Sequence, residues 1–181
     1  MGCSPGTVAP QQTACDRIRM ADADEFFSRG DDAQEAGDFD LARRCFEQGA
    51  ALGDANCLSR LAYLYDVGMG VPIDKRRARG LYLRAWRLGC HVAGNNLAIL
   101  HREAGNHGAM ARWFRRAMER GDNGARIELA KCYLQGLGVE PSPTLALRNL
   151  QVALADDDIV DWERDEAQAL VASLAPKLVT I

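Results

Sequence analysis

The sequence lacks long hydrophobic runs and contains few aromatic residues. No apolar stretch approaches the ~20 residues that a helix needs to cross a bilayer, so no membrane span is expected. Hydrophobic residues make up 48% of the chain, but aromatic residues make up only 7%. A core must therefore be built mainly from Leu, Ala and Val, and alanine-rich interiors of this kind suit closely packed helices.

An excess of basic charge is also absent. The formal net charge is -3 at pH 7, whereas a dedicated nucleic-acid-binding domain would be strongly basic, so no nucleic-acid partner is expected. The charge is nevertheless unevenly distributed, because acidic residues dominate segments 22–40 and 156–166 while basic residues crowd the middle of the chain. The predicted basic patch comprises Lys75, Arg76, Arg77, Arg79, Arg112, Arg115 and Arg116. These residues either form a solvated helix face or attract an acidic protein, RNA or anionic lipid headgroups.

Paired cysteines and a secretory leader are missing as well. The six cysteines form no C-x-x-C pair and have no regular spacing, which indicates free thiols in a reducing compartment and predicts a cytoplasmic location. Residues 1–20 lack the apolar region of a secretory signal and are predicted to form a disordered tail, with Met20 as an alternative start. The myristoylation pattern needs Ser or Thr at position 6, where this chain has Gly6, so acylation is not predicted.

The sequence does contain an internal repeat. Residues 61–86 reappear 68 positions later as residues 129–154, with Leu, Ala, Tyr, Gly-x-Gly-Val and two Ala in register. Segments 25–53 and 93–121 resemble each other in the same way, so short and long units alternate. The predicted organisation is a repeat region at 21–160, with units near 25–56, 57–92, 93–124 and 125–160, followed by a C-terminal capping helix and tail at 161–181.

Each unit is predicted to fold as helix, turn, helix. In residues 55–67 the apolar side chains recur with the 3.6-residue period of a helix, and the Gly and Pro residues of 68–72 end it. Asp74 is the predicted N-cap of the next helix, 75–88. In the fourth unit Gly136 and Gly138 end the first helix, and Ser142 or Thr144 starts the second.

Small residues and the last helix complete the packing prediction. A set of alanines at repeat positions is expected where helices cross closely: Ala62, Ala78, Ala85, Ala98, Ala117, Ala130, Ala146 and Ala153. Residues 161–174 are expected to form a helix that caps the stack. Its packed face is predicted to carry Trp162, Ala169, Leu170 and Leu174.

The repeated pattern of Leu-Ala, Tyr, Gly-x-Gly-Val and Ala resembles the Sel1-like repeat, a relative of the tetratricopeptide repeat. Units 57–92 and 125–160 carry this pattern, whereas the short units lack the Gly-x-Gly-Val turn and look closer to plain tetratricopeptide repeats. The resemblance implies an all-α, right-handed α-solenoid of about four two-helix repeats with a capping helix. It also implies a non-enzymatic adaptor or scaffold of the kind found in bacterial signalling, secretion, envelope assembly and host interaction.

Motifs for chemistry are not evident. The two Gly-x-Gly turns lack the further glycine or the Gly-Lys-Ser/Thr of a phosphate-binding loop and do not follow a strand. Possible metal ligands are scattered along the chain, at Cys90, His91, His101, His107 and Cys132, so no metal and no cofactor are predicted. His101 is expected to pack, because it holds the repeat position of Tyr65 and Tyr133. No nucleophile signature is present, although a Cys/His pair that meets only in space stays open.

The remaining candidate for function is the inner surface of the solenoid, which the first helix of each unit lines. Residues on the non-packing side of these helices form the predicted groove: Asp31, Gln34, Ser59, Tyr63, Asp66, Asn95, Ile99, Arg102, Lys131 and Gln135. We expect the groove to bind an extended peptide or a helix of another protein, with Tyr63 and Arg102 as the strongest contacts. The alternative is that these residues simply face water.

Overall fold

Helices account for all the regular structure in the computed structural model, which describes residues 14–157 and 159–178. The helices form consecutive pairs: α1 (Ala14–Glu35) with α2 (Phe39–Ala51), α3 (Ala55–Val67) with α4 (Lys75–Arg87), α5 (Val92–Glu103) with α6 (His107–Glu119), and α7 (Asn123–Gln135) with α8 (Pro143–Leu154). A last helix, α9 (Asp161–Leu178), follows the fourth pair. Each helix packs mainly against its neighbours in the sequence, as expected of a repeat protein.

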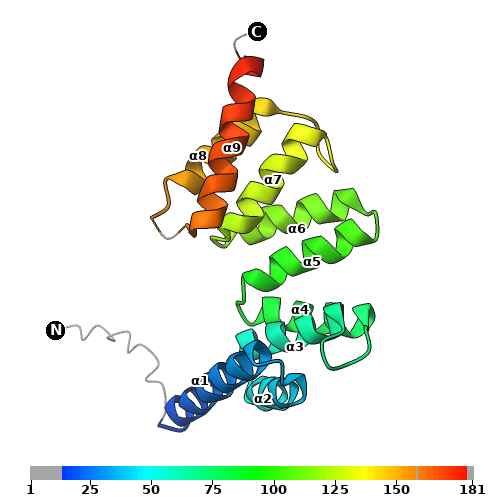
Figure 1. Ribbon diagram of the computed structural model, residues 1–181, viewed down its shortest axis with the longest axis vertical. Coiled ribbons are helices and arrows are strands. Elements are labelled where there is room, and N and C mark those ends of the chain that lie inside the picture. The colour runs from blue at the N-terminus through cyan, green and yellow to red at the C-terminus, as the bar shows by residue number, and fades with distance from the viewer. Residues whose placement is uncertain (1–13, 158, 179–181) are drawn as a thin grey trace, which may run out of the picture.

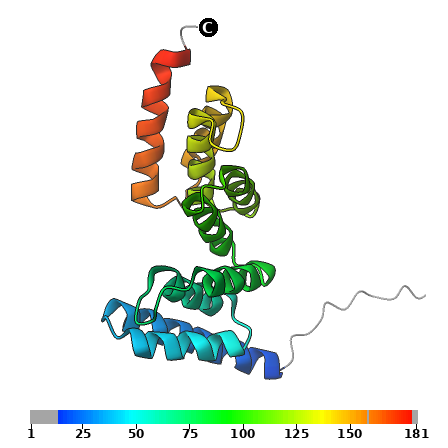
Figure 2. The ribbon, with the colours of Figure 1, turned by 90° about the vertical axis from the view of Figure 1, so that its right-hand side faces the viewer.

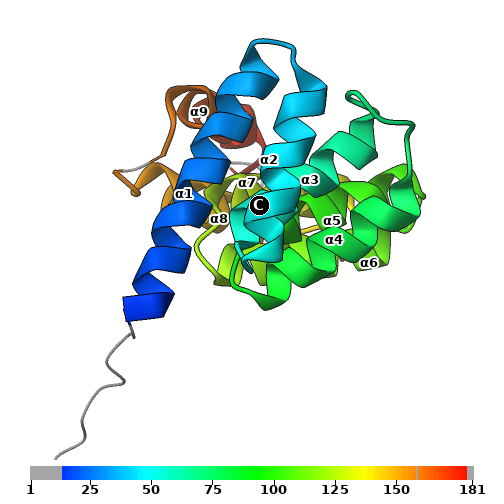
Figure 3. The same cartoon turned by 90° about the horizontal axis from the view of Figure 1, so that it is seen from below.

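The pairs stack along one long axis, from α1 and α2 at one end to α9 at the other (Figure 1). Seen along that axis, successive pairs are rotated relative to one another (Figure 3). The all-α solenoid predicted from the sequence is therefore confirmed for the described residues. Helix α1 begins at Ala14, inside the segment 1–20 that was predicted to be a tail, and residues 1–13 lie outside the described residues.

The long turns end their helices with the same backbone contacts in both copies. Gly68, at φ +82°, and Gly136, at φ +70°, adopt the left-handed conformation and donate to carbonyls four residues earlier. The N–H of Asp74 then donates to the carbonyl of Tyr65 at 2.8 Å. In the fourth unit the N–H of Ser142 makes the same bond to the carbonyl of Tyr133, at 2.9 Å.

The predicted N-caps of the second helices are found at these turns. The carboxylate of Asp74 accepts from the N–H of Arg77, which confirms Asp74 as the cap of α4. The hydroxyl of Ser142 accepts from the N–H of Leu145, so Ser142 rather than Thr144 caps α8. The turns of the short units are tighter: Gly37 and Gly105 have positive φ, and Asp38 and Asn106 cap the helices that follow.

Alanine forms the close contacts between helices. All eight of the alanines expected at crossings are 0% exposed, which confirms that prediction. Three clusters of buried apolar side chains follow one another along the stack, and Trp86 packs against both the first and the second of them. The core is thus a chain of linked clusters in which each unit is completed by its neighbours.

Helix α9 packs against α8 at the C-terminal end of the stack (Figure 2). Its contact face carries Ala167, Leu170, Val171 and Leu174. The prediction was wrong for two members of that face, because Trp162 is 65% exposed and Ala169 is also exposed. At about 100° per residue, Trp162 lies roughly 140° around the helix from Ala167 and therefore points away from the core.

Candidate functional site

Two pockets lie along the first helices of the pairs. The first, which we call the C-terminal pocket, has a volume of about 560 Å³ and is lined by residues of α5, α7, α9 and the loops before them. The second, the N-terminal pocket, has a volume of about 340 Å³ and is lined by residues of α1, α3, α5 and the loop before α5. Val92 at the start of α5 lines both. Together they form what we call the inner groove.

The structure places half of the predicted groove residues on these two pockets. Ser59 and Tyr63 line the N-terminal pocket. Asn95, Ile99 and Arg102 line the C-terminal pocket. These five residues come from α3 and α5, so the first helices of the second and third units supply the predicted contacts.

The other predicted groove residues lie around the pockets or away from them. Asp31 on α1 forms an ion pair of 3.0 Å with Arg60, which lines the N-terminal pocket. The side-chain oxygen of Gln34 is buried without a hydrogen-bond partner among the described residues. Gln135 is exposed at the end of α7.

Asp66 lies between helices of its own unit. It is only 7% exposed, and its carboxylate accepts from the Nζ of Lys75 at 2.7 Å and from the hydroxyl of Tyr82 at 3.3 Å. Helical spacing puts Asp66 on the same face of α3 as Ser59 and Tyr63, but its carboxylate accepts hydrogen bonds from side chains of α4. Burial, and then the charge of Asp66, raises the pKa of Tyr82, so this hydroxyl stays protonated and donates.

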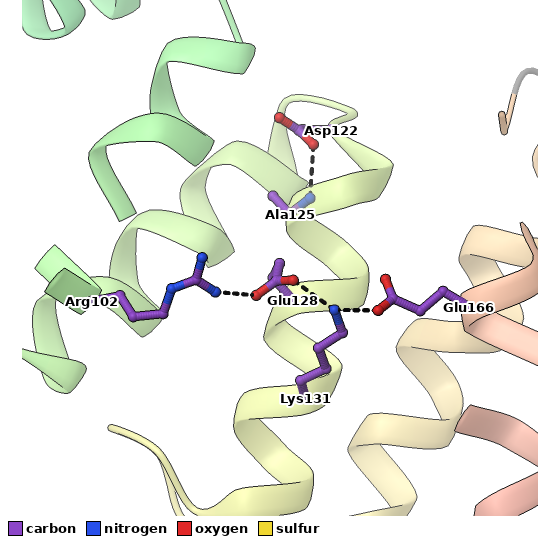
Figure 4. A network of polar contacts seen from close by, with 6 residues as sticks. All are labelled: Arg102, Asp122, Ala125, Glu128, Lys131 and Glu166. Carbon is purple, nitrogen blue, oxygen red and sulfur yellow. Dashed lines mark hydrogen bonds and ion pairs between the residues drawn. The ribbon is translucent and has the colours of Figure 1, made fainter. Parts of the chain in front are cut away.

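Lys131 belongs to a network of ion pairs that crosses the C-terminal pocket (Figure 4). Glu128 on α7 accepts from Arg102 on α5 at 2.9 Å and from Lys131 at 2.7 Å. Lys131 also pairs with Glu166 on α9 at 2.6 Å. Burial lowers the pKa of Lys131, but its hydrogen bonds to the two carboxylates outweigh that effect and raise the pKa. The network therefore connects α5, α7 and α9 through groups that remain charged.

The C-terminal pocket is rich in carboxylates that the groove prediction did not include. The acidic residues that line it are Asp122, Glu128, Asp156, Glu163 and Glu166. The acidic run at 156–166 was visible in the sequence, but nothing in the sequence showed that α9 carries part of it to the groove. Trp162 lines the same pocket because it points away from the core.

Asp122 and Glu163 meet at the N-terminus of α7. The carboxylate of Asp122 accepts from the N–H of Ala125 at 2.8 Å and caps the helix (Figure 4). Burial raises the pKa of Asp122, and burial together with the charges of Asp122 and Glu166 raises the pKa of Glu163. A Cβ at Gly124 would lie 2.8 Å from Oε1 of Glu163 and 3.4 Å from Oδ1 of Asp122, so glycine leaves room for both carboxylates.

Most of the predicted basic patch is engaged within the protein. The guanidinium of Arg77 lies 3.9 Å from the ring centre of Tyr65, and that of Arg116 lies 5.1 Å from that of Trp113. Arg115 donates to the hydroxyl of Tyr133 at 3.4 Å. Lys75 pairs with Asp66 and with Glu103, both at 2.7 Å. No such partner is found in the described part of the chain for the remaining three members of the patch: Arg76, Arg79 and Arg112.

A pocket of about 520 Å³ lies beside this patch. Lys75, Arg76 and Arg79 line it together with side chains of α5 that include His101. His101 is partly buried, and burial followed by the charges of Arg79 and Arg112 lowers its pKa. None of the residues that line this pocket lines the inner groove.

The four cysteines whose side chains the structure describes show no sign of reactivity. Cys45, Cys57, Cys90 and Cys132 are buried free thiols. Burial raises the pKa of Cys57 and raises that of Cys132 to about 11, which keeps both in the unreactive protonated form. Within residues 14–157 and 159–178, no group of His, Cys, Asp and Glu side chains could hold a metal ion. No helix in the same ranges is long and apolar enough to cross a membrane.

Comparison with known proteins identifies repeats at three of the four helix pairs, and the pair formed by α5 and α6 is not matched. Three segments match the family model of the Sel1 repeat: residues 18–54, 55–90 and 124–158. The first of these is a short unit without the Gly-x-Gly-Val turn, so the family pattern extends beyond the two long units. The comparison with curated proteins finds no match.

Solved structures show the same fold. The chain is similar to the crystal structure of a Sel1 repeat protein from Oxalobacter formigenes, with 25% identity and a TM-score of 0.64 over 77% of this chain. It also resembles a protective antigen with an SLR fold from uropathogenic Escherichia coli strains, with 19% identity and a TM-score of 0.55 over 88% of this chain. The matched regions span 55% and 46% of those two proteins, respectively.

Proposed function

Because the chain belongs to the Sel1 repeat family, whose members generally mediate protein–protein interactions, we propose that it is a non-enzymatic adaptor that holds a segment of another protein in the inner groove. One observation carries this proposal. The two pockets of the groove are lined by the first helices of the pairs, by α9 and by adjoining loops, and they share Val92. A single extended segment or helix can therefore contact residues from α1 to α9.

The side chains on the groove suit such a partner. Tyr63 is partly buried in the N-terminal pocket and offers an aromatic surface with a polar tip. Ile99 and Arg102 present apolar and charged contacts in the C-terminal pocket. Aromatic residues and arginine are the types that contribute most to protein interfaces, so Tyr63 and Arg102 are the proposed main contacts.

Substitution of these two residues tests the proposal. We expect Tyr63→Ala and Arg102→Ala to reduce capture of partner proteins in affinity purification with quantitative mass spectrometry. The fold should persist in Arg102→Ala, because Arg102 is a half-exposed member of its ion pair with Glu128 and such pairs contribute at most about 1 kcal/mol. Circular dichroism checks that point.

Arg148→Ala and Val152→Ala on α8 serve as matched controls, because both residues are exposed and neither lines the groove. The proposal predicts that both controls capture the wild-type set of proteins. If the two groove variants also captured that set unchanged, the partner would bind elsewhere.

The alternative is that the basic segments between residues 75 and 120 bind RNA or anionic lipid. The arrangement of the patch favours this less, because Lys75, Arg77, Arg115 and Arg116 already have partners within the protein. Binding of this kind would weaken steeply between low and physiological salt, because each neutralised phosphate releases counterions. The buried free thiols fit the cytoplasmic location that we propose for the adaptor.

A further inference from the structure

The C-terminal pocket carries more negative than positive charge. Asp122, Glu128, Glu163 and Glu166 line it, and the cations that form ion pairs there are Arg102 and Lys131. Asp156 also lines the pocket, and its carboxylate accepts from the Nδ2 of Asn123 at 2.8 Å. These two cations pair with Glu128 and Glu166. The remaining negative charge therefore includes Glu163, for which no ion-pair partner is found among the described residues, and Asp122, which caps α7 beside it.

The pocket also contains a hydrogen-bond acceptor that is not used within the chain. The Oδ1 atom of Asn95 is buried and has no donor in the described part of the chain. A buried acceptor without a partner is unfavourable, because it has lost its hydrogen bonds to water. Asn95 lies on α5 and Glu163 on α9. Among the described residues, neither Oδ1 of Asn95 nor the carboxylate of Glu163 accepts a hydrogen bond from a side chain.

An aromatic surface completes the site. Trp162 is 65% exposed and precedes Glu163 on α9. A cation held over an exposed tryptophan ring is attracted by the ring, and a charge-assisted hydrogen bond to a carboxylate adds to that attraction. Among protein side chains, only arginine and lysine combine a permanent positive charge with several N–H donors.

We infer that the C-terminal pocket selects a lysine or arginine side chain of the partner segment, seated between Trp162 and the carboxylate of Glu163. This inference rests on the function proposed above and specifies the chemistry of the partner: a cationic segment whose apolar neighbours contact Ile99 and Val92. Gly124 leaves room for the carboxylate of Glu163 in its present position, because a Cβ there would lie 2.8 Å from Oε1 of Glu163.

Selection from a library of random peptides displayed on phage tests the inference. We expect the wild-type chain to enrich peptides that contain Lys or Arg beside apolar residues. A selected peptide should bind about three- to tenfold more weakly when its basic residue is replaced by glutamine. Trp162→Ala and Glu163→Gln should reduce the affinity for the basic peptide by a similar factor and leave its glutamine counterpart almost unaffected.

Two further variants distinguish the effect of the position of the Glu163 carboxylate from the effect of charge alone. Gly124→Ala keeps every charge but moves Glu163, so it should weaken binding of the basic peptide as Glu163→Gln does. Glu119→Gln removes an exposed carboxylate on α6 that does not line the groove, so it should bind both peptides like the wild-type chain.

Each result is decisive. One contrary result is that selected peptides bind Tyr63→Ala more weakly than the wild-type chain and yet show no preference for basic residues. Another is a preference for basic residues that persists in Glu163→Gln. Either result would overturn the inference while the proposed groove function stands. If no selected peptide depended on the groove residues at all, both would be overturned.

Discussion

Two aspartates of this chain show how the same side chain takes different roles at different helix ends. Asp66, in the last turn of α3, is stabilised by donors from Lys75 and Tyr82 on α4. Asp122 caps α7 with a bond from Ala125, but burial raises its pKa despite that bond. The carboxylate of Asp122 is thus held in the groove at a cost to stability near neutral pH.

The substitution Asp122→Asn measures that cost. A carboxyl whose pKa is raised on folding binds its proton more tightly in the folded state, so stability falls as pH rises through the interval between the unfolded and folded pKa values. Asparagine caps a helix as well as aspartate does and carries no charge. We expect the variant to raise the free energy of unfolding at pH 7 by about 0.5–1 kcal/mol, and this gain should disappear below about pH 4.

Urea unfolding at both pH values provides the measurement. Asp38→Asn, at the exposed cap of α2, controls for the exchange of one capping side chain for another. Equal stabilisation of the Asp122 variant at low and neutral pH would show that the charge of Asp122 is not the cause.

At the scale of the element, the two glycines of each Gly-x-Gly-Val turn have different tasks. The first, Gly68 or Gly136, ends the helix in the left-handed conformation. The second lies against the preceding pair: a Cβ at Gly70 would collide with Phe39, and one at Gly138 would collide with the backbone of His107. Phe39 and His107 both begin the second helix of a short unit, so the long turn of one unit is pressed on the unit before it.

This contact predicts a difference between two glycines with the same backbone conformation. Gly138 has φ +72° and touches the start of α6, whereas Gly105 has φ +70° and no heavy atom lies within 4 Å of a Cβ built there. Gly105→Ala should lose about 1–2 kcal/mol of unfolding free energy, which is the cost of a left-handed alanine. Gly138→Ala should lose at least about 1 kcal/mol more, because the backbone of α6 must also move.

Thermal and urea denaturation of the two variants provide the test. Since the conformational cost is nearly the same at both positions, the difference between the variants isolates the contact between units. Similar losses in both would mean that the turn does not fix how the units stack.

At the scale of the whole molecule, a pair of tryptophans links the two halves of the solenoid. The indole of Trp86 packs edge-on against that of Trp113, with ring centres 5.5 Å apart. Arg120 lies 3.5 Å above the ring of Trp86 and donates to its carbonyl at 2.7 Å. Gly94 leaves room for the ring, because a Cβ there would lie 2.6 Å from a ring carbon. Trp86 and Trp113 both pack against the first and second core clusters and connect them.

Removal of the Trp86 side chain should uncouple the half formed by α1–α4 from the half formed by α5–α9. We expect Trp86→Ala to lose roughly 2–4 kcal/mol, and we expect unfolding in urea to split into two transitions because neighbouring units couple only through their interfaces. Hydrogen exchange should show separate protection levels for α1–α4 and α5–α9. Leu88→Ala, an exposed residue just after α4, is the control and should unfold like the wild-type chain in a single transition.

The sequence by itself determined the elements and their repetition. The 3.6-residue period, the cap at Asp74 and the alanines at the crossings are local signals, because the physics of a helix and its ends involves residues only a few positions apart. At the start of α8 the sequence left Ser142 and Thr144 as alternatives, and the structure shows Ser142. Repetition extended these signals to the fold, since a repeated unit must bury its apolar face against its neighbours.

Only the tertiary structure decided which side chains share a site. In the folded chain Asp66 accepts from Lys75, and Trp162 is exposed. Glu128 of α7 pairs with Arg102 of α5, and Lys131 pairs with Glu166 of α9. These outcomes depend on the rotation of each helix about its own axis and of each pair relative to the next. Small differences in side-chain volume across the interfaces set those rotations, and no residue pattern within one helix encodes them.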